Sequence, residues 1–132
     1  MKPAIVFNAV DSEATGLHRM LYPIQLLKEK GYRVEPLNYF SQIEQIERND
    51  IAFLQCLAGE QQFSLMERFR QDGIKIVIDY DDDFSNLPNK ILKKLNISQE
   101  QVTSNWKFYL DSANHITVPT EMLKKRIGEL TK

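Results

Sequence analysis

The sequence predicts a single α/β domain built on a doubly wound, Rossmann-like, mainly parallel five-stranded sheet with helices on both faces. Short continuous apolar runs recur along the chain, as is typical of buried strands. Segments of about a dozen residues with helically spaced apolar side chains separate these runs. Glycines at Gly31 and Gly73 close two of the helical segments. Continuous apolar strands joined by helices indicate parallel βαβ units whose sheet is covered on both faces.

The expected strands are the short runs rich in Ile, Val and Phe, together with one partly alternating segment. They span residues 4–8, 32–38, 51–57, 74–79 and 115–118. Pro36 has no N–H to donate to a neighbouring strand. We therefore expect the second strand to end early or to lie near an edge of the sheet.

The expected helices are marked by capping residues and by apolar positions three or four apart. They begin near Leu17, at a Ser41/Glu44 capping box, at Glu60, after Pro88, at a Ser98/Gln101 capping box with Trp106 inward, and at the N-cap Thr120. Pro23 lies inside the first of these helices and removes a backbone donor. It should kink that helix unless the first turns are irregular.

Composition fits one domain, residues 1–132, and a cytoplasmic protein. The chain has 132 residues and is 42% hydrophobic, enough for one core. No stretch is long and apolar enough to span a bilayer, and the N-terminus lacks the apolar region of a signal peptide. Cys56 is the one cysteine and falls in an apolar run, which favours a small buried side chain in mid-strand. We expect no cofactor and no metal ligand set.

Charge is unevenly distributed along the chain. Residues 1–88 carry 9 Lys and Arg against 14 Asp and Glu, about -5, whereas residues 89–132 carry 8 against 4, about +4. The basic part could bind phosphate groups or an acidic surface, or form solvated helix faces. No arginine-rich stripe alternates with exposed aromatic residues, which argues against a nucleic-acid partner.

The strongest functional pointer is an acidic turn that follows the fourth expected strand. Asp79, Asp81, Asp82 and Asp83 place four carboxylates within five residues, and such charges repel one another unless something offsets them. Ligands of open α/β sheets bind beyond the carboxyl ends of the strands. The turn could bind a hard cation, bind another ligand or act as a base, or simply be hydrated.

Two further clusters follow other strands at the same edge. Gly16, His18 and Arg19 place backbone donors and a cation at a helix start, where a phosphate or carboxylate could bind. No dinucleotide-binding or P-loop fingerprint accompanies them, and Arg19 could instead pair with the acidic turn. His18 fits a surface histidine as well as a catalyst. Thr120 and Glu121 form the third cluster.

Several segments carry a resemblance in their order and spacing. They are the loop and helix through Gly16-Leu-His-Arg19, the strand 75–79 with its acidic turn and Leu87-Pro88, the segment 112–118, and Pro119-Thr-Glu-Met-Leu-Lys124. Together they resemble the N-terminal domain of GT-B-fold glycosyltransferases, particularly divergent members from tailed phages and bacteria. The resemblance covers nearly the whole chain.

That resemblance implies an acceptor-side half of an enzyme that transfers sugar from a nucleotide-sugar donor. Gly16 and Arg19 would face the cleft between two domains, and Asp81 and Asp82 would occupy the place where many members have a His-Asp pair. Asp81 would then be the candidate base, provided that its pKa approaches neutrality. Asp79, Asp83, His18, Thr120 and Glu121 would contribute to ligand binding. The donor-binding C-terminal domain is absent, so we expect this chain alone to be inactive.

Two other functions remain open. In a GT-A-like enzyme, the stretch from Asp79 to Asp83 would hold a metal that binds a nucleotide sugar. Alternatively, the fold could serve as a non-catalytic module that binds a protein partner or forms a homo-oligomer. The sugar acceptor and the nucleotide-sugar donor are the partners expected under the first interpretation.

Overall fold

The computed structural model describes residues 2–38 and 49–131 of the chain. Within these residues, five strands form one sheet in the order β2-β1-β3-β4-β5. The strands are β1 (Ala4–Phe7), β2 (Arg33–Pro36), β3 (Ile51–Gln55), β4 (Lys75–Asp79) and β5 (His115–Thr117). Every neighbouring pair is parallel. The predicted doubly wound, Rossmann-like fold is thus confirmed, and β2 is an edge strand as Pro36 indicated.

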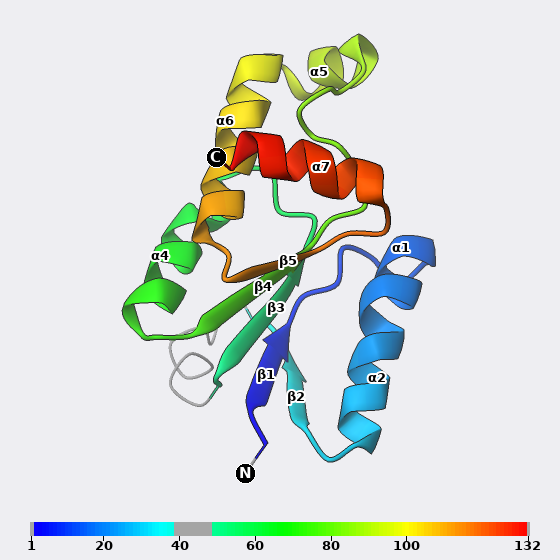
Figure 1. Cartoon of the computed structure of the whole chain (residues 1–132), viewed down its shortest axis with the longest axis vertical. Coiled ribbons are helices and arrows are strands. Elements are labelled where there is room, and N and C mark those ends of the chain that lie inside the picture. Colours follow the sequence, from blue (N-terminus) through cyan, green and yellow to red (C-terminus); the bar gives the residue numbers. More distant parts are fainter. Residues whose placement is uncertain (1, 39–48, 132) are drawn as a thin grey trace.

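The helices cover the sheet on two sides and at its carboxyl end (Figure 1). They are α1 (Ala14–Gly16), the π-helix η1 (Leu17–Leu21), α2 (Tyr22–Glu29), the 3₁₀-helix η2 (Glu60–Gln62), α4 (Phe63–Gln71), α5 (Asn89–Leu95), α6 (Gln99–Ser112) and α7 (Glu121–Leu130). None of the helices in the described ranges is long and apolar enough to cross a membrane. The helix predicted from Ser41 and Glu44 lies outside the described residues.

Two groups of buried side chains reflect the alternation of side chains along each strand. Val6, Leu54 and Ile78 belong to the larger cluster, which includes side chains of α4 and α6. Ile5 packs with Met20 and Ile24 in a smaller cluster beneath α2. Figure 1 shows α2 on one side of the sheet and α4 and α6 on the other. Trp106 is fully buried, as predicted.

Within the described residues the predicted caps at Gly31, Gly73, Ser98 and Thr120 are present, but the side chain of Gln101 does not complete the predicted capping box, because it donates to Asn105 Oδ1 at 2.8 Å. Gly31 and Gly73 have φ angles of 89° and 72°, a left-handed conformation that glycine adopts without steric cost. Ser98 Oγ accepts from Gln101 N at 3.1 Å, and Thr120 Oγ1 accepts from Leu123 N at 3.1 Å. Each hydroxyl therefore satisfies an amide that the helix itself leaves unpaired.

Pro23 is accommodated by a π-helical turn rather than by a kink. Tyr22 N donates to Leu17 O, five residues back, at the end of η1. Proline lacks an N–H, and its ring would collide with the carbonyl four residues earlier, so a wider turn relieves both problems. The helix thus has irregular first turns, the exception under which no kink was expected, and they include His18 and Arg19.

The strand order places the topological switch point between β1 and β3, where doubly wound sheets usually bind ligands. Here the chain's own polar groups occupy that position. Gln55 Oε1 accepts from Val10 N at 2.9 Å, and Gln55 Nε2 donates to Thr15 O at 3.2 Å. A ligand therefore has more space beyond β4 and β5, next to α7.

Candidate functional site

Asp79 is the buried anchor of the acidic turn rather than a ligand-facing residue. Its side chain is 2% exposed, and it accepts from Arg19 Nε at 2.8 Å and from Arg19 Nη2 at 2.5 Å. Thr117 Oγ1 at 2.6 Å and Gln55 Nε2 at 3.3 Å complete its hydrogen bonds. The two-pronged contact matches the fork of a guanidinium to a carboxylate. Asp79 thus joins β4 to η1, β3 and β5.

Arg19 fulfils the alternative that the sequence left open, since it pairs with the acidic turn. Its side chain is 27% exposed, and the hydrogen bond to Asp79 raises the pKa of the guanidinium. The charge that an external anion would use is therefore already matched. This pair offsets one of the four clustered carboxylates.

Gly16 is a close-packing position whose amide is already engaged. A Cβ at this residue would lie 1.7 Å from Asp11 O, so no larger residue fits without movement of the loop. Asp11 Oδ1 accepts from Gly16 N at 2.9 Å and from Glu13 N at 3.0 Å. An anion at the predicted position would compete with this carboxylate for the same donors. Asp11 thus satisfies two backbone amides at the start of this helical segment.

Tyr80 fixes the acidic turn from its middle. Its side chain is fully buried, and its hydroxyl donates to Leu57 O. Its ring meets Trp106 edge-on, with centroids 5.6 Å apart. Because side chains alternate along a strand, Asp79 and Tyr80 anchor the turn on opposite faces of the sheet. The carboxylates that follow are held in fixed positions.

Asp81 is half-buried where the loops after β1 and β3 meet the turn. It accepts from Thr15 Oγ1 at 3.1 Å and from Cys56 Sγ at 3.4 Å. Burial, reinforced by the charge of Asp81, raises the pKa of the Cys56 thiol to about 12. The thiol is therefore protonated near neutral pH and acts as a donor to Asp81.

The prediction of Cys56 as a buried mid-strand residue is wrong. β3 ends at Gln55, and Cys56 is half-buried with a φ of 54°. This left-handed conformation breaks the extended backbone, and it turns the thiol toward the acidic turn. A positive φ at a non-glycine residue leaves no trace in the sequence.

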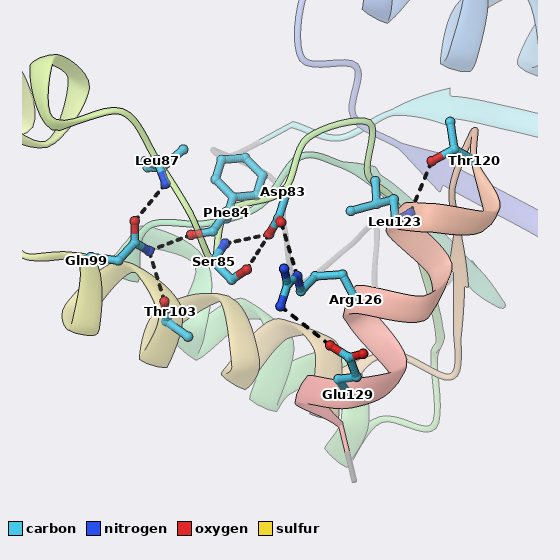
Figure 2. A network of polar contacts seen from close by, with 10 residues as sticks. All are labelled: Asp83, Phe84, Ser85, Leu87, Gln99, Thr103, Thr120, Leu123, Arg126 and Glu129. Carbon is cyan, nitrogen blue, oxygen red and sulfur yellow. Dashed lines mark hydrogen bonds and ion pairs between the residues drawn. The ribbon is translucent and has the colours of Figure 1, made fainter.

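Asp82 and Asp83 have different surroundings. The side chain of Asp82 is largely exposed, but its pKa is raised. The larger cause is the part of its surface that neighbouring atoms shield from water, and the smaller cause is the negative charge of Asp81. Asp83 Oδ1 accepts from Ser85 N at 2.9 Å, and Asp83 Oδ2 lies 3.4 Å from Arg126 Nε. Figure 2 shows Arg126 of α7 between Asp83 and Glu129. Asp83 thus connects the acidic turn to α7.

A hollow of about 380 Å³ separates the acidic turn from α7. Asp81 and Asp83 line it on one side, whereas Thr120, Lys125 and Arg126 are among the α7-side residues. Met122, Leu123 and Glu129 complete its lining. The hollow therefore presents carboxylates, cationic side chains and some apolar surface to a ligand.

The structure brings only some of the predicted site residues together. Asp81, Asp83 and Thr120 come together around the hollow. Arg19 and Asp79 form the internal pair, and Gly16 is enclosed by the loop after β1. His18 is exposed and meets Tyr22 edge-on at 5.3 Å, while Glu121 is exposed in the first turn of α7.

The metal-binding alternative loses one of its carboxylates. Asp79 is taken by Arg19, which leaves Asp81 and Asp83 to supply an Asp-x-Asp pair. Across residues 2–38 and 49–131, no group of three or more His, Cys, Asp or Glu side chains is placed to hold a metal ion. A hard cation prefers six or more oxygen ligands, so the remaining pair would depend heavily on water.

Sequence reasoning missed several polar residues of this region, notably Thr15, Gln55, Thr117 and Arg126. Gln55 carried a signal, because it is a polar residue at the end of an apolar run. A buried glutamine in such a position needs partners. The contacts of Thr15, Thr117 and Arg126 depend on tertiary packing and left no such signal.

Comparisons with known proteins support the fold and carry no information about the site. No protein-family model matches the chain, and no curated protein matches it. The chain is similar to a crystal structure of a conserved protein from Enterococcus faecalis, with 14% identity and a TM-score of 0.50. That match covers 97% of this chain and 99% of the other. At such low identity the similarity concerns the fold alone.

Proposed function

We propose that this domain is the acceptor-side half of a glycosyltransferase-like enzyme and binds a hydroxyl-bearing acceptor in the hollow between the acidic turn and α7. The observation that carries the proposal is the hollow itself, which Asp81 and Asp83 line opposite Thr120 and Arg126. It lies at the carboxyl edge of a doubly wound sheet, the edge at which such folds bind ligands, but beyond β4 and β5 rather than at the filled switch point between β1 and β3. Carboxylates and cationic side chains offer both acceptors and donors to hydroxyl groups.

Asp81 is the base in this proposal. A carboxylate here would accept the proton of the acceptor hydroxyl as its oxygen bonds to the sugar carbon, and the nucleoside diphosphate would leave with the bonding electrons. Thr15 and Cys56 hold the carboxylate in one orientation. The neighbouring Asp82 is another carboxylate, and its own pKa is raised, so comparison of Asp81→Asn with Asp82→Asn would separate the roles of the two residues.

The nucleotide-sugar donor would bind a second domain, as the resemblance implies. Calorimetry on the 132-residue chain should therefore detect weak binding of sugar acceptors and no binding of nucleotide sugars. Asp81→Asn should weaken acceptor binding, whereas Asp72→Asn, a change on the far end of α4, should not.

Three results would count against this proposal. Binding of a nucleotide sugar that requires Mn²⁺ and is lost in Asp81→Asn would favour the metal-dependent alternative. Binding of acceptors with equal affinity by the wild-type chain and by Asp81→Asn would remove the hollow from the site. A domain that binds sugars but remains inactive when joined to a donor domain would instead be a non-catalytic module.

A further inference from the structure

The helix α5 is an exposed basic element that the candidate site does not use. None of its residues is buried, and Figure 1 shows it beyond α7, set apart from the sheet. Ile91 and Leu95 are 42% and 59% exposed, although both are large aliphatic side chains. Other large hydrophobic side chains of the domain are also exposed, such as Leu26 and Met122, so exposure alone does not mark a contact, and the arrangement of the charges around Ile91 and Leu95 has to be considered with it.

The side chains of α5 are arranged as an amphipathic surface. Ile91 and Leu95 lie four residues apart and therefore share one side of the helix. Lys90 and Lys94, each one residue earlier, form a parallel basic row beside them, and Lys93 lies farther around. Leu92 is half-buried and lines a hollow together with Ile97, whereas Ile91 and Leu95 are exposed, so the aliphatic pair is not the helix's attachment to the domain.

The helix is firmly attached at both ends. Asn96 adopts the left-handed conformation, and Ile97 N donates to Leu92 O at 3.2 Å, which closes α5 in a Schellman-like cap. Gln99 Oε1 accepts from Leu87 N at 2.7 Å, and Gln99 Nε2 donates to Phe84 O at 2.8 Å (Figure 2). The loop from Phe84 to Leu87 directly follows the acidic turn. The orientation of α5 is thus coupled to that of the candidate site.

We propose that α5 docks the domain on an anionic lipid bilayer, with Ile91 and Leu95 in the headgroup boundary and the lysines at the lipid phosphates. A bilayer fits better than a protein partner because two aliphatic side chains on a seven-residue helix offer far less area than a stable protein interface buries. Lysine stems reach from an apolar boundary to phosphate groups. Nucleic acid fits poorly, since α5 has no arginine and no aromatic residue.

The docking inference is independent of the glycosyltransferase proposal. It rests on α5 alone, and it would hold for a binding module as well as for an enzyme. Its consequence is positional: a domain docked through α5 holds the carboxyl edge of its sheet near the lipid surface.

Vesicle co-sedimentation of the full chain tests the inference. We expect binding to vesicles of phosphatidylcholine mixed with phosphatidylglycerol and none to phosphatidylcholine alone. Each lysine near an anionic surface contributes about fivefold in affinity, so Lys90→Gln with Lys94→Gln should weaken binding about 25-fold. The matched pair Lys28→Gln with Lys30→Gln, exposed at the end of α2, removes the same charge and should change binding less than threefold.

A second pair of variants separates docking from general charge attraction. Ile91→Ser with Leu95→Ser keeps every lysine and should weaken vesicle binding about tenfold or more, while circular dichroism shows that the fold persists. Failure of the intact chain to bind anionic vesicles would overturn the inference. So would equal losses in the two lysine pairs, or a self-association, measured by light scattering, that Ile91→Ser with Leu95→Ser abolishes.

Discussion

Arg19→Met removes a buried ion pair while keeping most of the apolar stem of the side chain. Asp79, 2% exposed, would retain Thr117 Oγ1 and Gln55 Nε2 as donors but lose its counter-charge. Removal of one partner from a buried pair costs about 3–5 kcal/mol. Arg19 is itself 27% exposed, so water can reach the vacated position, and we expect about 3 kcal/mol. For a domain of this size, that loss lowers Tm by about 10 °C.

The assay is urea unfolding followed by the fluorescence of Trp106, the one tryptophan, which is fully buried. Arg68→Met is the matched control, because Arg68 pairs with Asp72 at the surface with side chains 45% and 35% exposed. Exposed pairs four residues apart contribute about 0.5 kcal/mol or less. In a double-mutant cycle with Asp79→Asn, the coupling energy should be about 2 kcal/mol. If Arg19→Met costs no more than Arg68→Met, Arg19 is not the structural partner described above.

Three further predictions concern single residues. Gly16→Ala should lower the free energy of unfolding in urea by at least about 3 kcal/mol, because the new Cβ would overlap Asp11 O. In the control Gly128→Ala, in α7, the Cβ meets no atom within 4 Å, and the change should raise that free energy by about 0.5–1 kcal/mol. Similar effects of the two variants would contradict the close packing of the loop after β1. Cys56, with a pKa of about 12, should react with a thiol reagent at pH 8 far more slowly than free cysteine, and Asp81→Asn should speed the reaction; a rate equal to that of free cysteine would show that the thiol is neither buried nor bonded to Asp81. The pKa of Asp82 is raised on folding, so its ionisation opposes folding as pH rises; Asp82→Asn should raise Tm at pH 7 but not at pH 3, and an unchanged Tm at pH 7 would place Asp82 in a fully solvated setting.

The fold was predictable from the sequence because its signals are local. Apolar runs marked four of the strands, and a partly alternating segment marked β2. Capping residues such as Ser98 and Thr120 marked helix starts at which their hydroxyls accept hydrogen bonds from backbone amides. Pro23 predicted a kink unless the first turns were irregular, and it did not reveal that the irregularity would be a π-helix. The π-helix avoids a clash between the ring of Pro23 and the carbonyl groups before it, and the surrounding fold decides how that clash is avoided.

The candidate site was only partly predictable. The acidic turn was recognised as a group, but its carboxylates have separate roles, since Asp79 is internal and Asp83 contacts α7. The alternation of side chains along a strand could have shown that Asp79 and Tyr80 lie on opposite faces of the sheet. The partners of these carboxylates are distant in the sequence, since Arg19 belongs to η1 and Arg126 belongs to α7. Such long-range contacts have no local signature, and the backbone conformation of Cys56 has none either.

The most direct test of the proposed site is a ¹⁵N chemical-shift titration of the 132-residue chain with candidate acceptor sugars. If the hollow binds an acceptor, the amides of Asp81, Thr120 and Leu123 should shift together, and Asp81→Asn should need a higher sugar concentration to reach the same shifts, whereas Asp72→Asn should not. Shifts confined to other surfaces, or shifts around the hollow that survive unchanged in Asp81→Asn, would contradict the assignment of the acidic turn and α7 as the acceptor site.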